Sequence, residues 1–402
     1  MSLTPARLTA LQSTYRQGLL ERTIPFWLKH GPDRIYGGLL TGLGEDGAVI
    51  DTDKAIWLQG RAAWTFATLA LTVEPKAEWL DLSRSCLDFI RTHGRGPEGK
   101  LYFTVTREGK PLRMRRYVYS ECFATIGSAA YARATGDTRA AAEAVAYFET
   151  YLRHSFTPGV MPPKTDPETR PMKGVAPLMI AIVTAQEVRA LLGDLTVGGR
   201  TCTGWIDHAI AEIEAHFYKP DLGALLEVAS PDGGFIDHFD GRTLNPGHAI
   251  ECAWFILHEA KLRGRDPRLL KLGLGILDCM WARGWDQEFG GLLYFTDLHG
   301  KPVQDYWAEM KFWWPHNEAE IATLLAYQLT GDARYAAWHT QVHDWSHRVF
   351  ADPVHGEWFG YAHRDGRIST RLKGNTWKGP FHLPRMQAYC GRLTTELLAQ
   401  PA

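Results

Sequence analysis

The fold of this chain is decided by a stretch in its middle, Asn245-Pro246-Gly247-His248-Ala249-Ile250-Glu251-Cys252-Ala253-Trp254. Asn-Pro-Gly interrupts regular structure, and the apolar residues that follow recur at helical spacing, so we expect a helix start packed into a core. His248 and Glu251 lie three residues apart and therefore share one face of the first turn. A lone pair of this kind often only caps a helix. This pair is informative because the arrangement recurs.

A short pattern of strand-forming residues around glycine, followed by a helical pattern, repeats along the chain. The first copy is Asp33–Leu40, closed by the turn Glu45-Asp46-Gly47, and the others are Gly99–Phe103, a degenerate Leu222–Leu226, Phe289–Phe295 and His355–Tyr361. Glycine turns flanked by strand formers are typical of β-hairpins. Successive clear copies are separated by about 60 to 68 residues or a multiple of that length, which is enough for two helices and one hairpin.

The period predicts the architecture. One sixth of the 402 residues is 67, so the chain holds six such units. Six helical hairpins that close on themselves form an inner ring of helices covered by an outer ring. We therefore expect an all-α fold, an (α/α)6 barrel (toroid) with short β-hairpins between helices, as a single catalytic domain over residues 1–402. A two-domain helical protein is the alternative, but no Pro/Ser-rich linker marks a boundary.

Composition narrows the class of partner. The formal net charge is −1, which gives no electrostatic reason to expect nucleic acid or an anionic membrane. No signal-peptide pattern opens the sequence, and no apolar run approaches the roughly 20 residues that span a bilayer. The six cysteines lack Cys-x-x-Cys spacing and mostly lie in apolar helical patterns, which indicates reduced thiols. We expect a cytoplasmic protein that binds a neutral small molecule.

The titratable residues recur with the same period. His248 and His316 are 68 residues apart, His316 and His382 are 66 apart, and Glu251 and Glu318 are 67 apart. Arg61 and Glu121 fall near the matching place in the first two units. If these units supply the inner ring, all seven side chains are expected to converge on one end of the central cavity.

The residues expected around this cavity suit a sugar. Aromatic faces pack on the C–H faces of a pyranose while charged groups bond its hydroxyls, and the candidates are Trp57, Tyr119, Trp313, Trp314, Trp377 and Phe381. Imidazole has an ordinary pKa of about 6.5, so one histidine can remove the proton on C2 of an open-chain aldose while another supplies one. Arg61 is the candidate cation for the enediolate, and carboxylates such as Glu251 and Glu318 would orient imidazoles or hold hydroxyls.

Return of the proton to the opposite face of C2 gives the 2-epimer, and return to C1 gives a ketose. Hydrolysis by paired acids is a competing chemistry for this scaffold, with candidate carboxylates Asp232, Asp237, Asp240, Glu251 and Glu318. The sequence lacks a phosphate-binding loop, a dinucleotide fingerprint and a His-Glu-x-x-His zinc motif. We therefore expect no metal and no cofactor in the chemical step.

Motifs along nearly the whole chain resemble, in order, those of the N-acylglucosamine 2-epimerase (renin-binding protein) family. They are Trp57–Arg61, Tyr119–Ala124, Asn245–Glu251, Trp313–Ala319, His355–Tyr361 and Lys378–Arg385. The resemblance implies a cytoplasmic homodimer with an (α/α)6 barrel that interconverts N-acetylglucosamine and N-acetylmannosamine. It also implies that His248 and His382 are the acid/base pair, that Arg61 and Glu318 are essential, and that Glu251, His316 and Arg385 lie nearby.

The same scaffold also carries cellobiose 2-epimerases and aldose–ketose isomerases, so an isomerase or an epimerase of unmodified sugars is the alternative. Such relatives usually place a further histidine on the third inner helix, whereas Pro171–Met179 here has none. The resemblance further implies ATP as an allosteric activator. Lys164, Arg170 and Lys173 on a Pro-rich loop are candidates to meet its phosphates, and a solvated basic loop is the alternative interpretation of these residues. A non-catalytic binding protein is a further alternative, and the combination of His248, His382, Arg61 and Glu318 argues against it.

Overall fold

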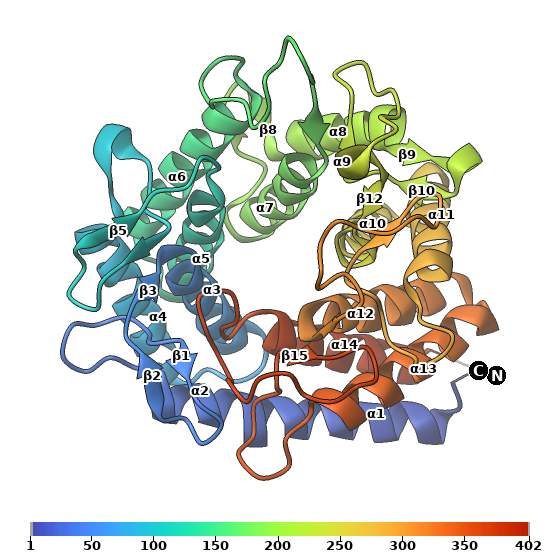
Figure 1. Cartoon of the computed structure of the whole chain (residues 1–402). Helices are drawn as coiled ribbons and strands as arrows, with labels where there is room; N and C mark the ends of the chain where they lie inside the picture. The colour runs from blue at the N-terminus through green and yellow to red at the C-terminus, as the bar shows by residue number, and fades with distance from the viewer. Residues whose placement is uncertain (1–2, 401–402) are drawn as a thin grey trace.

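The computed structural model describes residues 3–400 and folds them into a closed ring of helices (Figure 1). The inner ring consists of α3 (Ile56–Thr72), α5 (Tyr119–Thr135), α7 (Ala176–Leu192), α10 (Pro246–Leu262), α12 (Trp313–Thr330) and α14 (His382–Leu398). Neighbouring inner helices pack against each other, and α14 closes the ring by packing against α3 and the first helix. The predicted (α/α)6 barrel is confirmed.

The outer ring covers each inner helix with the helix that follows it in the chain, except that the first helix covers α14. Its members are α1 (Pro5–Gln17), which runs on through η1 (Gly18–Thr23) into α2 (Ile24–His30), then α4 (Ala77–Phe89) with η2 (Ile90–Gly94), α6 (Thr138–Phe156), α8 (Cys202–Glu212) with η4 (Ile213–Phe217), α11 (Pro267–Gly284) and α13 (Ala333–Phe350). The first three of these elements run without a break from Pro5 to His30. Short helices η3 (Pro97–Gly99), η5 (Pro220–Leu222) and α9 (Phe239–Arg242) lie in the connections.

Burial distinguishes the two rings. Residues 313–326 of α12 are all buried, because an inner helix has neighbours on every side. Close approach of inner helices requires small residues: a Cβ on Gly60 of α3 would come within 2.5 Å of the Phe123 carbonyl carbon of α5. No helix among residues 3–400 combines the length and apolar character needed to cross a membrane.

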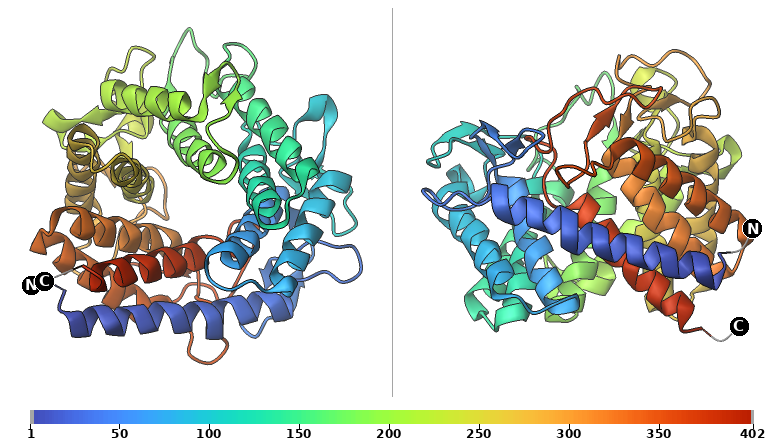
Figure 2. Two further views of the ribbon diagram at one scale, coloured as in Figure 1. Left: turned by 180° about the vertical axis from the view of Figure 1, so that it is seen from behind. Right: turned by 90° about the horizontal axis from the view of Figure 1, so that it is seen from below.

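Short antiparallel strands gather at the end of the barrel where the inner helices begin (Figure 2). The pairs are β1 (Gly42–Leu43) with β2 (Val49–Asp51), β3 (Lys54–Ala55) with β4 (Thr104–Val105) and β5 (Pro111–Arg113), β6 (Lys173–Gly174) with β11 (Val228–Ala229), β9 (Tyr218–Lys219) with β10 (Ala224–Leu225), β12 (Thr243–Leu244) with β13 (Thr296–Asp297), and β14 (Lys311–Phe312) with β15 (Tyr361–Ala362). These strands connect successive units across the mouth of the barrel. A further pair, β7 (Thr196–Val197) with β8 (Arg200–Thr201), joins the end of α7 to the start of α8 and therefore lies at the opposite end.

Three of the hairpin turns are held by the same buried ion pair. Lys54 Nζ lies 2.8 Å from Asp33 Oδ2, Lys311 Nζ lies 2.9 Å from Asp286 Oδ2, and Lys373 Nζ lies 2.7 Å from Asp352 Oδ2. In each pair the aspartate also accepts two backbone N–H bonds within its own turn. The repeat therefore includes a buried Asp–Lys clamp as well as glycine.

Replacing Lys373 with methionine should destabilise the protein strongly, because Asp352 would be left buried with no cation. The expected loss in the free energy of unfolding is about 3–5 kcal/mol, measured by urea denaturation.

The matched control is Lys54→Met. Arg107 would still pair with Asp33, at 2.9 Å, so the loss should be smaller by about 1–2 kcal/mol. Equal losses in the two variants would show that the charge left behind is not what destabilises the turn.

Candidate active site

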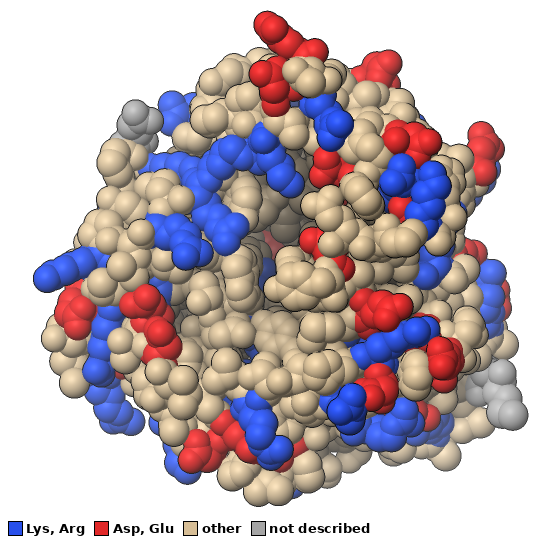
Figure 3. Space-filling model, in the orientation of Figure 1, with Lys and Arg blue, Asp and Glu red and all other residues tan. Residues whose placement is uncertain are grey.

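A cavity of about 1740 Å³ follows the axis of the barrel. Figure 3 shows its opening as the hollow at the centre of the hairpin face. All six inner helices contribute to its wall, with Arg61, Tyr119, Met179, His248, Trp314 and His382 as one residue from each. The cavity is larger than the roughly 300–1,000 Å³ of ordinary small-molecule sites, so a sugar fits within one end of it.

His248 lies in the first turn of α10, where the chain is fixed by the Asn245 cap. The Asn245 Oδ1 accepts the His248 backbone N–H at 3.1 Å. The His248 Nδ1 lies 2.7 Å from Glu227 Oε1, so Nδ1–H donates to the carboxylate and Nε2 is left for the cavity. Burial lowers the pKa of His248, but the Glu227 carboxylate outweighs burial and the pKa is raised. His248 is therefore suited to carry a proton near neutral pH.

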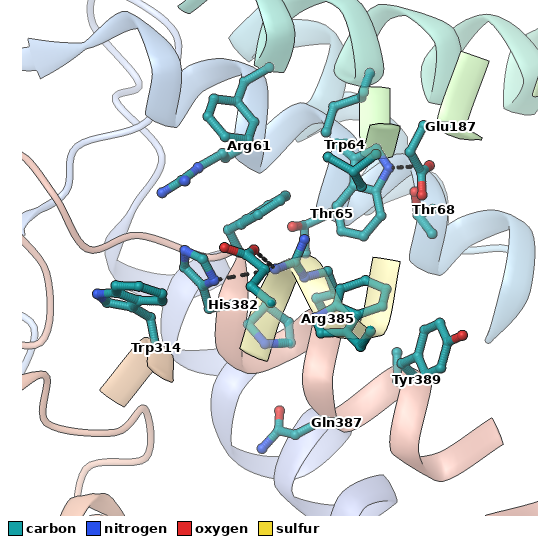
Figure 4. A pocket seen from close by; sticks show the side chains of 18 of the residues that line it. Arg61, Trp64, Thr65, Thr68, Glu187, Trp314, His382, Arg385, Gln387 and Tyr389 are labelled. Carbon is teal, nitrogen blue, oxygen red and sulfur yellow. Dashed lines mark hydrogen bonds and ion pairs between the residues drawn. The ribbon is translucent and has the colours of Figure 1, made fainter. Parts of the chain in front are cut away.

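His382 is the first residue of α14 and has the opposite electrostatics. Its Nδ1 lies 2.7 Å from Glu318 Oε1, which again leaves Nε2 free (Figure 4). Burial and the nearby guanidinium groups of Arg61 and Arg385 hold the pKa of His382 well below its ordinary value. His382 is therefore neutral at pH 7 and suited to accept a proton. Two titratable groups whose pKa values are pushed apart indicate an acid and a base.

Arg385 binds the two carboxylates of the site together. Its Nη2 donates to Glu251 Oε1 and to Glu318 Oε1, both at 2.7 Å. One oxygen of each carboxylate is therefore already hydrogen-bonded to a guanidinium group. Asp232, Asp237 and Asp240 are not among the residues that line the cavity. The paired acid that hydrolysis would need is therefore not formed by these candidates.

Arg61 is a cation held by aromatic rings. Its guanidinium carbon lies 4.3 Å from the ring centre of Trp57, 4.1 Å from Phe123 and 4.7 Å from Phe381. Among the described residues no hydrogen bond or ion pair reaches the Arg61 side chain, and its buried Nε has no partner. Burial lowers the pKa of Arg61 to about 9, so the group remains cationic at pH 7. A desolvated cation without an anion is well placed to stabilise negative charge that forms in the cavity.

The predicted aromatic residues all line the cavity, namely Trp57, Tyr119, Trp313, Trp314, Trp377 and Phe381. Trp377 is 43% exposed at the mouth, and its ring meets that of Trp57 edge to face at 5.6 Å. The ring of Trp314 contacts both histidines, with its centre 5.2 Å from that of His248 and 5.8 Å from that of His382. These aromatic rings line the same cavity as the two histidines and provide its apolar surface.

His316 was expected in the central cavity, but the structure places it elsewhere. It is fully buried outside the cavity wall. Its Nε2 accepts the Leu292 backbone N–H at 2.9 Å, and its Nδ1 lies 2.6 Å from the Phe312 carbonyl oxygen. Burial lowers the pKa of His316 to about 3. Residues two apart on a helix point about 200° apart, so Glu318 points towards His382 and Arg385 while His316 points towards the hairpin.

The same pairing of a hairpin-binding residue with a residue of the site two positions later recurs in other units. Gln59 bonds both backbone groups of Leu39 at 2.8 Å, and Glu121 accepts the Leu101 N–H at 2.7 Å. Each hairpin-anchoring residue is followed two positions later by a residue of the cavity wall, Arg61 and Phe123 respectively. Glu121, which was expected in the cavity, is thus another anchor. The period identified equivalent turns of the inner helices. Each of these turns carries both a residue that binds a hairpin and a residue of the cavity wall, and the period does not distinguish the two.

Sequence reasoning missed Glu227, the partner of His248. Glu227 directly follows the apolar run Leu222–Leu226 of the degenerate hairpin, and a charged residue at that place was the available signal. It also missed Tyr294 and Tyr361, which come from two other hairpins and line the cavity.

Comparisons with known proteins agree with this geometry. The sequence profile of the family described as N-acylglucosamine 2-epimerase matches residues 37–382. The N-acylglucosamine 2-epimerase of Homo sapiens is 36% identical over 396 residues, covering 95% of this chain and 90% of that protein. The cellobiose 2-epimerase of Bacteroides fragilis is 25% identical, covering 94% and 97%. A solved cellobiose 2-epimerase from Spirochaeta thermophila has the same fold, with a TM-score of 0.83, 21% identity and 98% coverage of each chain.

Replacing Glu227 with glutamine should lower the pKa of His248, because burial would then act without the opposing carboxylate. The fall is measured by NMR titration of the imidazole nitrogens. Glu187→Gln is the control, since Glu187 lines the same cavity but accepts from Trp64 Nε1 at 2.8 Å. An unchanged His248 pKa in Glu227→Gln would contradict the assignment of the acid.

Proposed function

Because this chain belongs to the N-acylglucosamine 2-epimerase family, we propose that it interconverts N-acetyl-D-glucosamine and N-acetyl-D-mannosamine, a sialic acid precursor. The observation that carries the proposal is the pair of cavity imidazoles. Each has its Nδ1 on a carboxylate, and their pKa values are shifted in opposite directions.

The reaction needs one proton to leave C2 and another to arrive on the opposite face. In the open-chain sugar the C1 aldehyde acidifies the C2–H. The neutral Nε2 of His382 accepts that proton, and the electron pair of the C2–H bond moves through C1=C2 onto O1 to give an enolate. The protonated Nε2 of His248 then donates its proton to the other face of C2, and the aldehyde forms again. The product differs only in the configuration at C2.

The starting protonation states follow from the surroundings of the two histidines. One turnover leaves His382 protonated and His248 neutral, which is the state that the reverse reaction requires. Glu227 and Glu318 fix both rings so that the same nitrogen of each faces the substrate. We assign both as positioning residues, and the same role goes to Arg385 through its bonds to Glu251 and Glu318.

Arg61 is assigned to the enolate oxygen. A cation that already lies in a desolvated aromatic setting costs no reorganisation when negative charge develops. The aromatic wall of Trp57, Tyr119, Trp313, Trp314 and Trp377 would hold the carbon skeleton of the sugar, and Glu251 lies where it could accept from hydroxyls.

The alternative is ketose formation or epimerisation of an unmodified sugar, as the names of related cellobiose 2-epimerases and a solved D-mannose isomerase suggest for those proteins. Ketose formation would require the proton to return to C1. With an acylated nitrogen on C2 this return gives an imine in place of a ketone, so an N-acyl substrate favours epimerisation.

The proposal also includes a cytoplasmic homodimer whose chemical step needs no cofactor, with ATP as an allosteric activator. Of the basic residues expected to meet phosphates, Lys173 is already engaged, since its Nζ lies 2.6 Å from His216 Nδ1 and 3.4 Å from Glu212 Oε2. Lys164 and Arg170 are exposed and remain the candidates.

Incubation of the protein with N-acetylmannosamine in heavy water should give both 2-epimers with deuterium at C2. In His248→Asn, epimerisation should fall by about 10²–10⁴-fold. Because His382 is intact, that variant should still exchange the C2 proton of one epimer alone. His382→Asn should exchange only the other epimer, as followed by proton NMR.

His154→Asn, on the outer helix α6, is the control and should epimerise normally. Exchange of both epimers in His248→Asn would contradict the two-base mechanism. Formation of a ketose by the unmodified protein would favour the isomerase alternative.

ATP at saturating concentration should raise the rate of epimerisation, and Lys164→Ala with Arg170→Ala should weaken that effect because the phosphates would lose their cations. The activity without ATP should be unaffected, and Lys173→Met should keep the ATP response. Equal rates with and without ATP would remove ATP from the proposal.

A further inference from the structure

A second cluster of histidine and carboxylate side chains lies on the far side of α12 from the active site. Its members are Glu320 of α12, His343 and His347 of α13, and Tyr15 of α1. His339 extends the row, so that α13 presents histidines at positions i, i+4 and i+8 on one face. Glu320 lies two residues beyond Glu318 and therefore points away from the cavity.

The carboxylate of Glu320 is fully buried without a lysine or arginine beside it. Among the described residues its only basic contacts are the imidazoles of His343, at 3.3 Å, and His347, at 3.8 Å. Its other partners are the hydroxyl groups of Tyr15, at 3.1 Å, and Ser346, at 2.7 Å. Burial lowers the pKa of both His343 and His347 to about 4, so these imidazoles are neutral at pH 7.

The active site provides a direct contrast. There Glu251, Glu318 and His382 form a group of two carboxylates and one imidazole, and Arg385 Nη2 supplies the cation at 2.7 Å from both carboxylates. A buried carboxylate without a counter-charge is costly, and proteins offset that cost by pairing it or by binding a metal ion. The cluster around Glu320 has the ligand atoms but lacks the protein cation.

The spacing of the ligand atoms suits a small divalent ion. Tyr15 Oη lies 3.1 Å from both Glu320 Oε2 and His343 Nδ1, and these two atoms are 3.3 Å apart. Ligands at about 2.0–2.1 Å around a tetrahedral zinc ion are separated by about 3.3 Å. The three contacts match that separation, and His347 adds a further imidazole, with its Nδ1 3.8 Å from Glu320 Oε1.

We propose that Glu320, His343 and His347, with Tyr15, form a binding site for a divalent transition-metal ion of the zinc class. Imidazole and carboxylate ligands select zinc-like ions over magnesium or calcium, which prefer oxygen. The ion would connect α1, α12 and α13 at the place where the first helix closes the outer ring. Its role is structural, because Glu320 and Glu318 lie on opposite faces of α12. The His347 side chain is 21% exposed, so the ion can enter from the surface.

Zinc uptake tests the site. The full-length protein is treated with EDTA, reloaded with ZnCl₂, desalted and analysed for metal by mass spectrometry. The unmodified protein should keep about one ion per chain and melt at a higher temperature than the metal-free form, since an ion that binds only the folded state stabilises it. The double variant His343→Gln, His347→Gln should keep none and show no such rise.

His154→Gln is the matched control. His154 Nδ1 contacts the carbonyl of Thr150 at 2.8 Å, just as His347 Nδ1 contacts that of His343 at 2.9 Å, but His154 is not part of the cluster. That variant should bind zinc like the unmodified protein. If the unmodified protein keeps no zinc, or the double variant keeps as much, the cluster is only a hydrogen-bonded network and the proposal is wrong.

Cobalt provides a second readout that needs no variant and decides the matter if the double variant fails to fold. Co²⁺ in the unmodified protein should show the strong visible bands of a four-coordinate ion with nitrogen ligands. The weak pink spectrum of hydrated, six-coordinate Co²⁺ would overturn the proposal.

Discussion

The Glu318 carboxylate is fully buried and joins three inner helices through its two oxygens. Oε1 accepts a hydrogen bond from Arg385 Nη2 of α14 and lies 2.7 Å from His382 Nδ1. Oε2 accepts the indole N–H of Trp254 on α10 at 2.7 Å. Such a charge is stable in the interior only while these partners remain in place. The position of α12 relative to α10 and α14 therefore also fixes the imidazole that is assigned to accept a proton.

The first turns of the inner helices have two functions in the barrel. The first turns must hold the hairpins that cover the mouth, and they must also present side chains to the cavity. Residues two apart on a helix point in nearly opposite directions. In Gln59 and Arg61, and again in His316 and Glu318, the first residue binds a hairpin and the second belongs to the site. In each pair, the residue that binds the hairpin fixes the position of the helix turn. It therefore also fixes where along the barrel axis the second side chain lies.

Much of this arrangement could be predicted from the sequence, and the limits have physical causes. The period of 66 to 68 residues between histidines indicated the ring and the equivalent helix turns. It could not indicate which way a residue faces, since a rotation of α12 that turns His316 outward leaves the spacing unchanged. Glu227 was missed because its partner is 21 positions away and belongs to another element. The Asp–Lys clamps were missed because a buried lysine looks in sequence like a solvated one. Histidines at i, i+4 and i+8 on α13 were visible, but Glu320 and Tyr15 reach them only through the fold.

The central claim is that two imidazoles act on opposite faces of one carbon atom. A crystal structure with the open-chain alcohol of N-acetylglucosamine bound would test it directly. The account predicts that C2 lies between the two rings, with Nε2 of His248 and Nε2 of His382 on opposite sides and each about 3–3.5 Å away. Both nitrogens on one side of C2, or either one too far away to reach it, would contradict the account.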